Sequence, residues 1–320
     1  MNTEEIVQAW AKTRGYRASV GGVSLLDEVR SALRERREAG EIEAGFYGDN
    51  LDIFTYLEGV PIGNWRSIII VAVPKPAYVL TFIVGDKTVE TILPPTYVRY
   101  RKTFADVRDD FAEAVSGLGF RVGLLNAPLK ALGSRLGLLS YGRNNVGYIA
   151  GLGSYFQLVG LVSDLPYDDS VPPRLAETLL PRCRECRICA AACPTGAIDR
   201  ERVLLHAEKC YTLFSESPRP IPESLKPPSP KCIIGCLRCQ ELCPENKGLL
   251  RHENAAVSFD AEETKAFLGM TPAKDGPAFD RVQTKFQELG LTEGLPVFRQ
   301  NLKRLLRLHG IPSFNSVPGI

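Results

Sequence analysis

All nine cysteines of this 320-residue chain lie in one window, between Cys183 and Cys243. A secreted disulfide scaffold spreads an even number of cysteines along a short chain, so this clustering instead predicts metal ligation. The rest of the composition is typical of a globular protein, with 44% hydrophobic and 24% charged residues and a net charge of +2. A charge this small gives no argument for nucleic acid as a partner.

The first run of cysteines, residues 183–194 (CRECRICAAACP), has the spacing C-x2-C-x2-C-x3-C-P of bacterial two-cluster ferredoxins. The two-residue gaps let one tight turn direct three thiolates at a single cubane. The fourth cysteine, which Pro194 follows, points toward a second cluster. Zinc ligands usually come as two separated pairs. Four cysteines in one run therefore favour [4Fe–4S] clusters over zinc.

The second run, residues 232–244 (CIIGCLRCQELCP), repeats the ending C-x2-C-x3-C-P. Two [4Fe–4S] clusters need eight thiolates, and the crossover pattern of such domains assigns seven of the nine. One cluster takes Cys183, Cys186, Cys189 and Cys243, and the other takes Cys193, Cys236 and Cys239. The eighth ligand is either Cys210 or Cys232, because each precedes Cys236 and the spacing does not decide between them.

The residues before the cysteine window predict an α/β domain. Apolar residues at three- and four-residue intervals indicate helices over residues 4–15, 24–39, 104–118 and 128–136. Apolar runs and alternation indicate strands over residues 67–73, 78–84, 88–93, 120–125 and 156–162, the second and third forming a hairpin. Ser24 is a candidate helix N-cap and Gly40 a candidate helix stop.

Two irregular segments allow more than one interpretation. Residues 215–231 contain six prolines and are either a solvated connector or the lining of a neighbouring cofactor. The glycine-rich residues 141–154 lack both GxGxxG and GxxxxGK[ST] order, which argues against a Rossmann or P-loop nucleotide site. They either approach a large flat ligand closely or form tight turns between strands.

Further absences narrow the function. The chain contains no apolar run of the ~20 residues that a membrane span needs, and its acidic N-terminal residues do not resemble a secretory signal, so we expect a cytoplasmic protein. All three histidines, from His206 onward, lie in or after the cysteine window. A proton donor in the first domain must therefore be Tyr, Lys, Asp, Glu or Arg.

Taken in order, these segments resemble epoxyqueuosine reductases and, more distantly, reductive dehalogenases, which are cobalamin-dependent reductases with two [4Fe–4S] clusters. Besides the first cysteine run, the resemblance is carried by residues 65–74, 97–101, 136–145, 153–156, 163–166, 210–213, 221–227 and 235–244.

The resemblance implies three parts. These are a nitroreductase-like corrinoid- and substrate-binding domain with a mixed sheet (residues 1–175), a ferredoxin-like double [4Fe–4S] domain (residues 176–250) and a C-terminal helical segment that packs back on the core (residues 251–320). It nominates Cys210 as the eighth ligand and leaves Cys232 as an extra thiol. It also implies base-off cobalamin, reduced by a ferredoxin or flavodoxin through the clusters. The implied corrinoid contacts are Gly142, Arg143, Asn144, Asn145, Gly153 and Ser154.

One position departs from the family pattern. Where epoxyqueuosine reductases typically carry an aspartate proposed to donate a proton, this chain has Lys102. The candidate catalytic residues are accordingly Lys102, Tyr97 and Tyr100, with Arg99 in the same segment. A buried lysine with a lowered pKa can donate a proton, whereas the alternative is a solvated lysine at a helix N-terminus.

Three functions follow in order of expectation. The first is a cobalamin-dependent iron–sulfur reductase of a small or nucleoside substrate, and the second is a true tRNA epoxyqueuosine reductase. The third is a ferredoxin-type electron-transfer protein without a corrinoid. The substitution at Lys102 weakens the tRNA assignment. So do residues 244–320, which leave little room for a helical-repeat tail, and the basic helix at residues 298–308 suits docking better than RNA binding.

Overall fold

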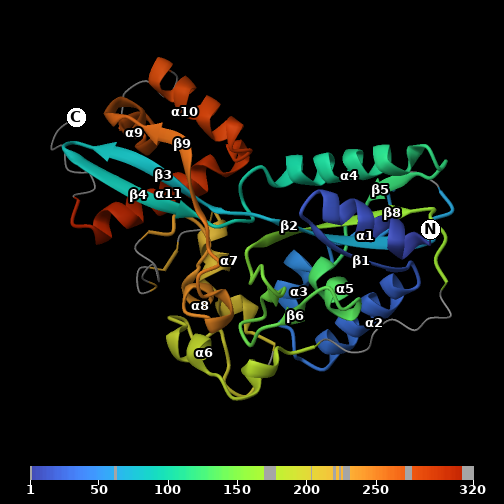
Figure 1. Ribbon diagram of the computed structural model, residues 1–320. Coiled ribbons are helices and arrows are strands. Elements are labelled where there is room, and N and C mark those ends of the chain that lie inside the picture. The colour runs from blue at the N-terminus through green and yellow to red at the C-terminus, as the bar shows by residue number, and fades with distance from the viewer. Residues whose placement is uncertain are drawn as a thin grey trace.

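The computed structural model describes residues 2–60, 63–168, 178–202, 204–218, 221–222, 225, 231–270 and 276–311. Figure 1 shows two units side by side, with the cysteine window below them and between them. The helices and sheets confirm the α/β class predicted from the sequence.

The first unit is built on a four-stranded antiparallel sheet in the order β1-β2-β8-β5. Its strands are β1 (Arg17–Gly22), β2 (Ser67–Pro74), β5 (Val122–Leu124) and β8 (Phe156–Ser163). Every residue of β2 except Pro74 is buried, as expected for a strand that is covered on both faces. Ile69 and Val71 face one core, whereas Ile68 and Ile70 face the other.

Helices cover both faces of this sheet (Figure 1). On one face lie α1 (Thr3–Thr13) and α4 (Tyr100–Ser116), and on the other lie α2 (Leu25–Glu38) and α5 (Leu129–Arg135). The short helix α3 (Ala44–Asn50) follows α2. Gly40 ends α2 as predicted, with φ +70°, while Ser24 precedes α2 with a helical backbone and makes no side-chain cap bond. These helices leave the C-terminal end of β2 pointing toward the second unit.

The second unit joins the predicted hairpin to the C-terminal part of the chain. Strands β3 (Ala77–Val84) and β4 (Lys87–Leu93) form the hairpin, and β9 (His252–Phe259) pairs with β3 in parallel. Helices α9 (Ala261–Leu268), α10 (Pro277–Glu288) and α11 (Leu295–Leu308) pack on this sheet, and the turn η4 (Thr292–Gly294) leads into α11. The C-terminal segment, expected to be helical, thus begins with a strand.

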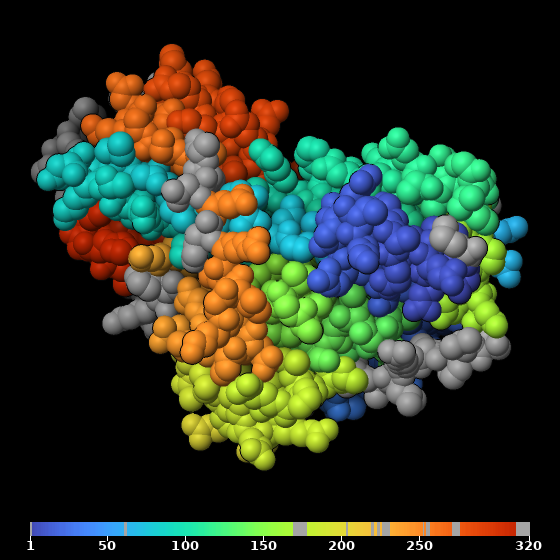
Figure 2. Space-filling model, viewed as in Figure 1, coloured from blue at the N-terminus to red at the C-terminus, as the bar shows by residue number. Residues whose placement is uncertain are grey.

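The cysteine window consists of short helices and turns, and Figure 2 shows it at the bottom of the molecule against both units. Its elements are η1 (Pro181–Arg184), α6 (Ile188–Ala192), η2 (Ala207–Lys209), α7 (Tyr211–Glu216), α8 (Arg238–Glu241) and η3 (Pro244–Asn246). The small sheet of β6 (Ser140–Tyr141) and β7 (Gly147–Tyr148) borders it. Most of the proline-rich segment lies outside the described residues, so neither of its two interpretations is decided.

Helix α11 packs as a docking helix. Leu302, Leu305 and Leu306 are buried in the second core. Two polar side chains of α11 bind the chain around α7: Asn301 donates to the carbonyl of Ser215 at 2.8 Å, and Arg304 donates to the carbonyl of Ile221 at 2.9 Å. In the part of the chain that the structure describes, no helix is long and apolar enough to cross a membrane.

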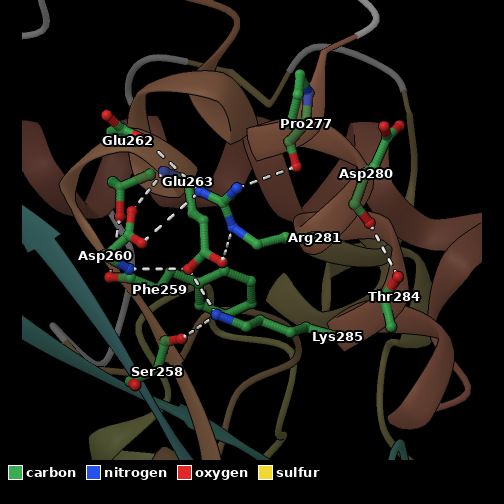
Figure 3. Close-up of polar contacts among 11 residues, drawn as sticks. Ser258, Phe259, Asp260, Glu262, Glu263, Pro277, Asp280, Arg281, Thr284 and Lys285 are labelled. Atoms are coloured by element: carbon green, nitrogen blue, oxygen red, sulfur yellow. Dashed lines mark hydrogen bonds and ion pairs between the residues drawn. The ribbon is translucent and has the colours of Figure 1, made fainter.

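A buried carboxylate joins α9 to α10 (Figure 3). Glu263 accepts hydrogen bonds from Lys285 Nζ at 2.5 Å and from Arg281 Nε at 3.1 Å, and its side chain is 2% exposed. It also completes a capping box with Asp260 at the start of α9. Burial favours the neutral acid, yet these hydrogen bonds together hold the pKa of Glu263 below its usual value.

Candidate functional site

A cavity of about 1010 Å³ lies where the first unit meets the cysteine window. Its wall combines the start of α4, the strand β8, the loop between β6 and β7, and the ends of α7 and α8. Small-molecule sites usually measure about 300–1,000 Å³, so this cavity is at the upper end of that range. The volume suits a large ligand, or a cofactor together with a substrate.

Four cysteines form part of the cavity wall, namely Cys193, Cys210, Cys236 and Cys239. They also act on one another electrostatically. Burial, with smaller contributions from the neighbouring thiols of Cys210 and Cys193, raises the pKa of Cys236 to about 12. These four positions comprise the three cysteines that the spacing assigned to the second cluster, plus Cys210.

A second group of cysteines lies outside the cavity wall. Burial raises the pKa of Cys189 to about 11, with contributions from Cys183, Cys243 and Cys186. This group corresponds to the set that the spacing assigned to the first cluster. In the described ranges, no three Cys, His, Asp or Glu side chains converge on one point as the ligands of a single metal ion do.

Cys232 occupies a different environment from these eight cysteines. It is buried, and its thiol donates a hydrogen bond to the carbonyl of Ile234 at 2.9 Å. The residues on either side pair with the hairpin, since Ile92 donates to the carbonyl of Lys231 and accepts from the amide of Ile233. The backbone at Cys232 therefore extends the edge of β4, and its thiol is directed at its own loop.

The segment predicted to be catalytic is divided between the cavity and the protein surface. Tyr97 and Tyr100 line the cavity, whereas Lys102 is not among the described residues of its wall. Because α4 begins at Tyr100, four residues earlier than predicted, residue 102 lies about 200° around the helix from residue 100. The ammonium of Lys102 pairs with Asp106 at 2.6 Å, and its side chain is 65% exposed. The placement is that of a solvated lysine in the first turn of a helix, not of a buried proton donor.

Arg99 also lies apart from the cavity. It stands at the N-cap of α4 with φ +52°, and its Nε donates to the carbonyl of Glu288 at the end of α10. Its backbone amide donates to the carbonyl of Leu289 at 2.8 Å. Arg99 therefore connects the first unit to the second. Of the four residues predicted to be catalytic, Tyr97 and Tyr100 are the two found in the described cavity wall.

The residues predicted to contact a corrinoid are divided in the same way. Asn144, Asn145 and Ser154 line the cavity, whereas Gly142, Arg143 and Gly153 are not among the described residues of its wall. These last three residues instead make contacts that hold the glycine-rich segment in place.

Arg143 is 4% exposed and donates to the carbonyls of Cys183 and Arg200. Gly153 has φ +60°, and a Cβ there would lie 2.3 Å from Oδ1 of Asn246. Gly142 is enclosed by Asn144 and Tyr148, at 2.5 and 2.6 Å from an added Cβ. These residues fasten the glycine-rich segment to itself and to the cysteine window.

Three cavity residues were not anticipated from the sequence. Gln157 in β8 donates to the carbonyl of Tyr100 at 3.0 Å, and its buried Oε1 has no hydrogen-bond partner among the described residues. Gln240 of α8 accepts a hydrogen bond from the hydroxyl of Ser154 at 2.8 Å. Glu216, at the end of α7, accepts a hydrogen bond from the hydroxyl of Tyr97. For these three residues, the sequence offered one signal, the polar Gln157 within the apolar run of residues 156–162.

Comparison with known proteins identifies the class of the cysteine window. Residues 182–246 match the family model described as the 4Fe-4S double cluster binding domain. The chain thus contains a domain for two [4Fe–4S] clusters, as the cysteine spacing predicted.

The chain has homologues among epoxyqueuosine reductases, which confirms the resemblance. It is 28% identical to the Pseudomonas aeruginosa enzyme over 248 residues, 77% of this chain and 62% of that protein. It is 29% identical to the Bacillus subtilis enzyme over 116 residues, 36% of this chain and 28% of that protein. The matched region therefore spans from about a quarter to less than two thirds of these curated relatives.

Solved structures show the same fold at lower sequence identity. The epoxyqueuosine reductase of Streptococcus thermophilus matches with a TM-score of 0.66 and 21% identity, covering 97% of this chain and 82% of that one. An epoxyqueuosine reductase with an epoxyqueuosine-modified tRNA-Tyr stem loop matches with a TM-score of 0.63 and 19% identity, covering 95% and 80%. A reductive dehalogenase is a distant neighbour with a TM-score of 0.38, too low to support an argument.

Proposed function

We propose that this protein is an iron–sulfur reductase in which two [4Fe–4S] clusters deliver electrons to a corrinoid and a substrate in the cavity. The observation that carries the proposal is the position of Cys193, Cys210, Cys236 and Cys239 in the cavity wall. A cluster held by these thiolates would border the cavity directly, so its electrons would reach a ligand there without crossing a layer of protein.

The same observation supports the choice of the eighth ligand. Cys210 shares the cavity wall with the other three cysteines of its set, and Cys193 acts on it electrostatically. Cys232 instead binds the carbonyl of Ile234 beside the hairpin edge. We therefore assign the inner cluster to Cys193, Cys210, Cys236 and Cys239, and the outer cluster to Cys183, Cys186, Cys189 and Cys243. The division of the chain into domains at residues 175 and 250 remains part of this proposal.

The cavity residues fit a large ligand with polar edges, such as cobalamin. The unpartnered Oε1 of Gln157 is a buried polar atom that needs a donor, and burying it without one is costly. Asn144, Asn145 and Ser154 add further polar groups to the wall. These four residues would hold the corrinoid, which when bound supplies a strongly reducing cobalt centre. Among the described lining residues there is no histidine, which is consistent with base-off binding without a protein imidazole.

The remaining side chains of the cavity would act on the substrate. Tyr97 and Tyr100 line the same cavity as the inner cysteines, and their hydroxyls would orient the reacting group by hydrogen bonds. Burial raises the pKa of Tyr100, so its hydroxyl stays protonated at neutral pH. A reduced ferredoxin or flavodoxin is the proposed source of electrons, which would enter through the outer cluster.

Epoxyqueuosine in tRNA is the substrate that the relatives favour. The curated homologues carry the name epoxyqueuosine reductase, and one solved structure of similar fold contains a modified tRNA stem loop. In support of this substrate, Lys102, which departs from the family pattern, is exposed, pairs with Asp106 and is not among the described residues of the cavity wall. A small-molecule substrate and a purely electron-transferring role remain the competing functions.

The test uses the full chain, reconstituted anaerobically with iron, sulfide and cobalamin. We expect about eight irons per chain and corrinoid absorbance that co-purifies with the protein. With dithionite as the reductant, conversion of an epoxyqueuosine stem loop to queuosine is followed by nucleoside mass spectrometry. Corrinoid uptake without conversion would reject the tRNA substrate, whereas iron without corrinoid uptake would reject the reductase. Cys193→Ser, which removes an inner ligand, is the control for cluster-dependent turnover.

A further inference from the structure

Four glutamates line the cavity, and their contacts separate their roles. The backbone amides of Gly45 and Phe46 hold the pKa of Glu43 below its usual value, so this residue is an ionised cap of α3. The carboxylate of Glu208 faces His206 at 3.3 Å. Glu41 lies beside Glu43 at the entrance to α3, far along the chain from the cysteines.

The fourth, Glu216, is the last residue of α7, and the N-cap of this helix is Cys210, a proposed inner-cluster ligand. Helix α7 begins directly after Cys210 and ends at Glu216. Both Glu216 and Tyr97 line the cavity, and the hydroxyl of Tyr97 donates to the carboxylate of Glu216.

We propose that Glu216, oriented by Tyr97, is the acid that protonates the substrate at this cavity. The proposal rests on the reductase function proposed above and names a catalytic residue for it. Lys102, the cation first considered for this role, pairs with Asp106 on the outer side of α4.

The position of Glu216 is fixed by contacts on two sides of α7. The hydroxyl of Ser215 accepts a hydrogen bond from the amide of Gly235 at 2.8 Å, and the carbonyl of Ser215 accepts one from Asn301 at 2.8 Å. Gly235 has φ +70°, and a Cβ there would lie 2.8 Å from the hydroxyl oxygen of Tyr97. The glycine therefore provides the space in which Tyr97 reaches Glu216.

The surroundings of Glu216 favour its protonated form. The protein around the cavity raises the pKa of this carboxyl, although the hydrogen bond from Tyr97 opposes the shift. In the described part of the chain, no Lys or Arg forms an ion pair with Glu216. Among the ionisable groups of the described residues, the thiol of Cys210 interacts electrostatically with Glu216 and Tyr97, and the thiol of Cys232 interacts with Tyr97.

Reduction of an epoxide to an alkene and water requires two electrons and two protons. Two reduced one-electron carriers supply two electrons through the clusters, and each carrier is oxidised once. Both carbon–oxygen bonds of the epoxide break, a carbon–carbon double bond forms, and the oxygen leaves as water with two protons. Glu216 gives one proton by breaking its own O–H bond, and solvent gives the other. The carboxylate that remains is stabilised by the hydroxyl of Tyr97 and regains its proton from solvent in the cavity.

The first test does not depend on turnover. Redox-induced infrared difference spectra of the holoprotein at neutral pH are compared for the wild type, Glu216→Gln and the control Glu113→Gln, which changes an exposed glutamate of α4. We expect a protonated-carboxyl band in the wild type and in the control, and its loss in Glu216→Gln. In Tyr97→Phe the band should persist to higher pH, because the hydrogen bond that lowers the pKa is removed. A band that Glu216→Gln leaves unchanged overturns the proposal.

The second test measures reduction of the epoxyqueuosine stem loop. General acids contribute about 10²- to 10⁴-fold, so Glu216→Gln should lower kcat at least 100-fold with unchanged iron content, corrinoid uptake and KM. Turnover of this variant within about threefold of the wild type would refute the role. If the wild type reduces no epoxide although the band is assigned to Glu216, the proposed function fails and the donor role fails with it. If the wild type reduces the epoxide but shows no protonated-carboxyl band, the donor role of Glu216 is rejected and the proposed function stands.

Discussion

The guanidinium of Arg143 binds the carbonyl of Cys183 at 2.7 Å and the carbonyl of Arg200 at 2.8 Å. One nearly buried side chain thus joins the glycine-rich loop of the first unit to the start of the first cysteine run and to Arg200, which follows that run. These two bonds hold the loop that borders the cavity against the turn that carries the cysteines proposed for the outer cluster. The position of the cavity wall relative to the cysteine window consequently depends on Arg143.

Replacing Arg143 should loosen this connection. In Arg143→Gln the buried carbonyl of Cys183 and the part-buried carbonyl of Arg200 lose their charged donor. An unsatisfied buried group costs about 1–3 kcal/mol. We expect the free energy of unfolding, measured by urea titration of the anaerobic holoprotein, to fall by that amount, and iron retention to fall with it. Arg108→Gln, at an exposed arginine paired with Asp109, should stay within about 0.5 kcal/mol of the wild type. Equal stability of the two variants would contradict the role of Arg143.

Cysteine variants should separate Cys210 from Cys232. Cys210→Ala removes a thiol from the cavity wall, so we expect about half of the reconstituted iron and sulfide to be lost, because one cubane has three thiolates left. Cys232→Ala removes only the hydrogen bond to Ile234 and should keep about eight irons per chain. Iron and acid-labile sulfide analysis after anaerobic reconstitution measures both. The reverse pattern would assign the ligand to Cys232.

Lys102→Ala should change stability and reductase activity very little. Its ion pair with Asp106 is exposed, and pairs at this helical spacing contribute about 0.3–0.5 kcal/mol. We therefore expect a small loss in the free energy of unfolding, and reductase activity within about twofold of the wild type. A large fall in kcat with intact clusters would return Lys102 to the list of proton donors.

The contribution of Glu263 to stability should depend on pH. Its folded pKa is lowered, so the stabilisation is fully present above the unfolded pKa of about 4.3 and is lost as the pH falls through the folded value. Hydrogen exchange of the α9 amides, corrected for intrinsic rates, should show Glu263→Gln less protected than the wild type at pH 6–7, with a difference that shrinks below about pH 4. Glu262→Gln, an exposed neighbour on α9, is the matched control and should show little difference at either pH. A pH-independent gap between wild type and Glu263→Gln would disprove the linkage.

The sequence predicted local elements well where hydrophobic periodicity determines them. The strand β2, the hairpin and the end of α2 at Gly40 lie where they were expected, because each is encoded by a continuous stretch of side chains. The helix α4 begins earlier than predicted, because Tyr100 adds an aromatic side chain to its first turn. The ring centroids of Tyr100 and Phe104 are 4.8 Å apart. That shift of one turn explains why Lys102 lies on the solvent side.

The cavity could be predicted only in part. The cysteine spacing and the asparagines of the glycine-rich segment pointed to it, since ligand motifs are local in the chain. The pairing of Tyr97 with Glu216 joins positions 119 residues apart, and no periodicity or motif records such a contact. The parallel pairing of β3 with β9 is equally non-local, because it depends on how the cysteine window returns the chain.

That return of the chain has a consequence for biosynthesis. During translation the hairpin leaves the ribosome with the buried residues Leu80 and Phe82 before their partner strand β9 exists. At 5–20 residues per second, the roughly 170 intervening residues take on the order of 10–35 seconds to be made. Throughout that interval the nascent polypeptide displays an unpaired strand edge, which invites self-association. The cysteine segment is synthesised within the same interval, so cluster loading and completion of the second sheet would compete in time.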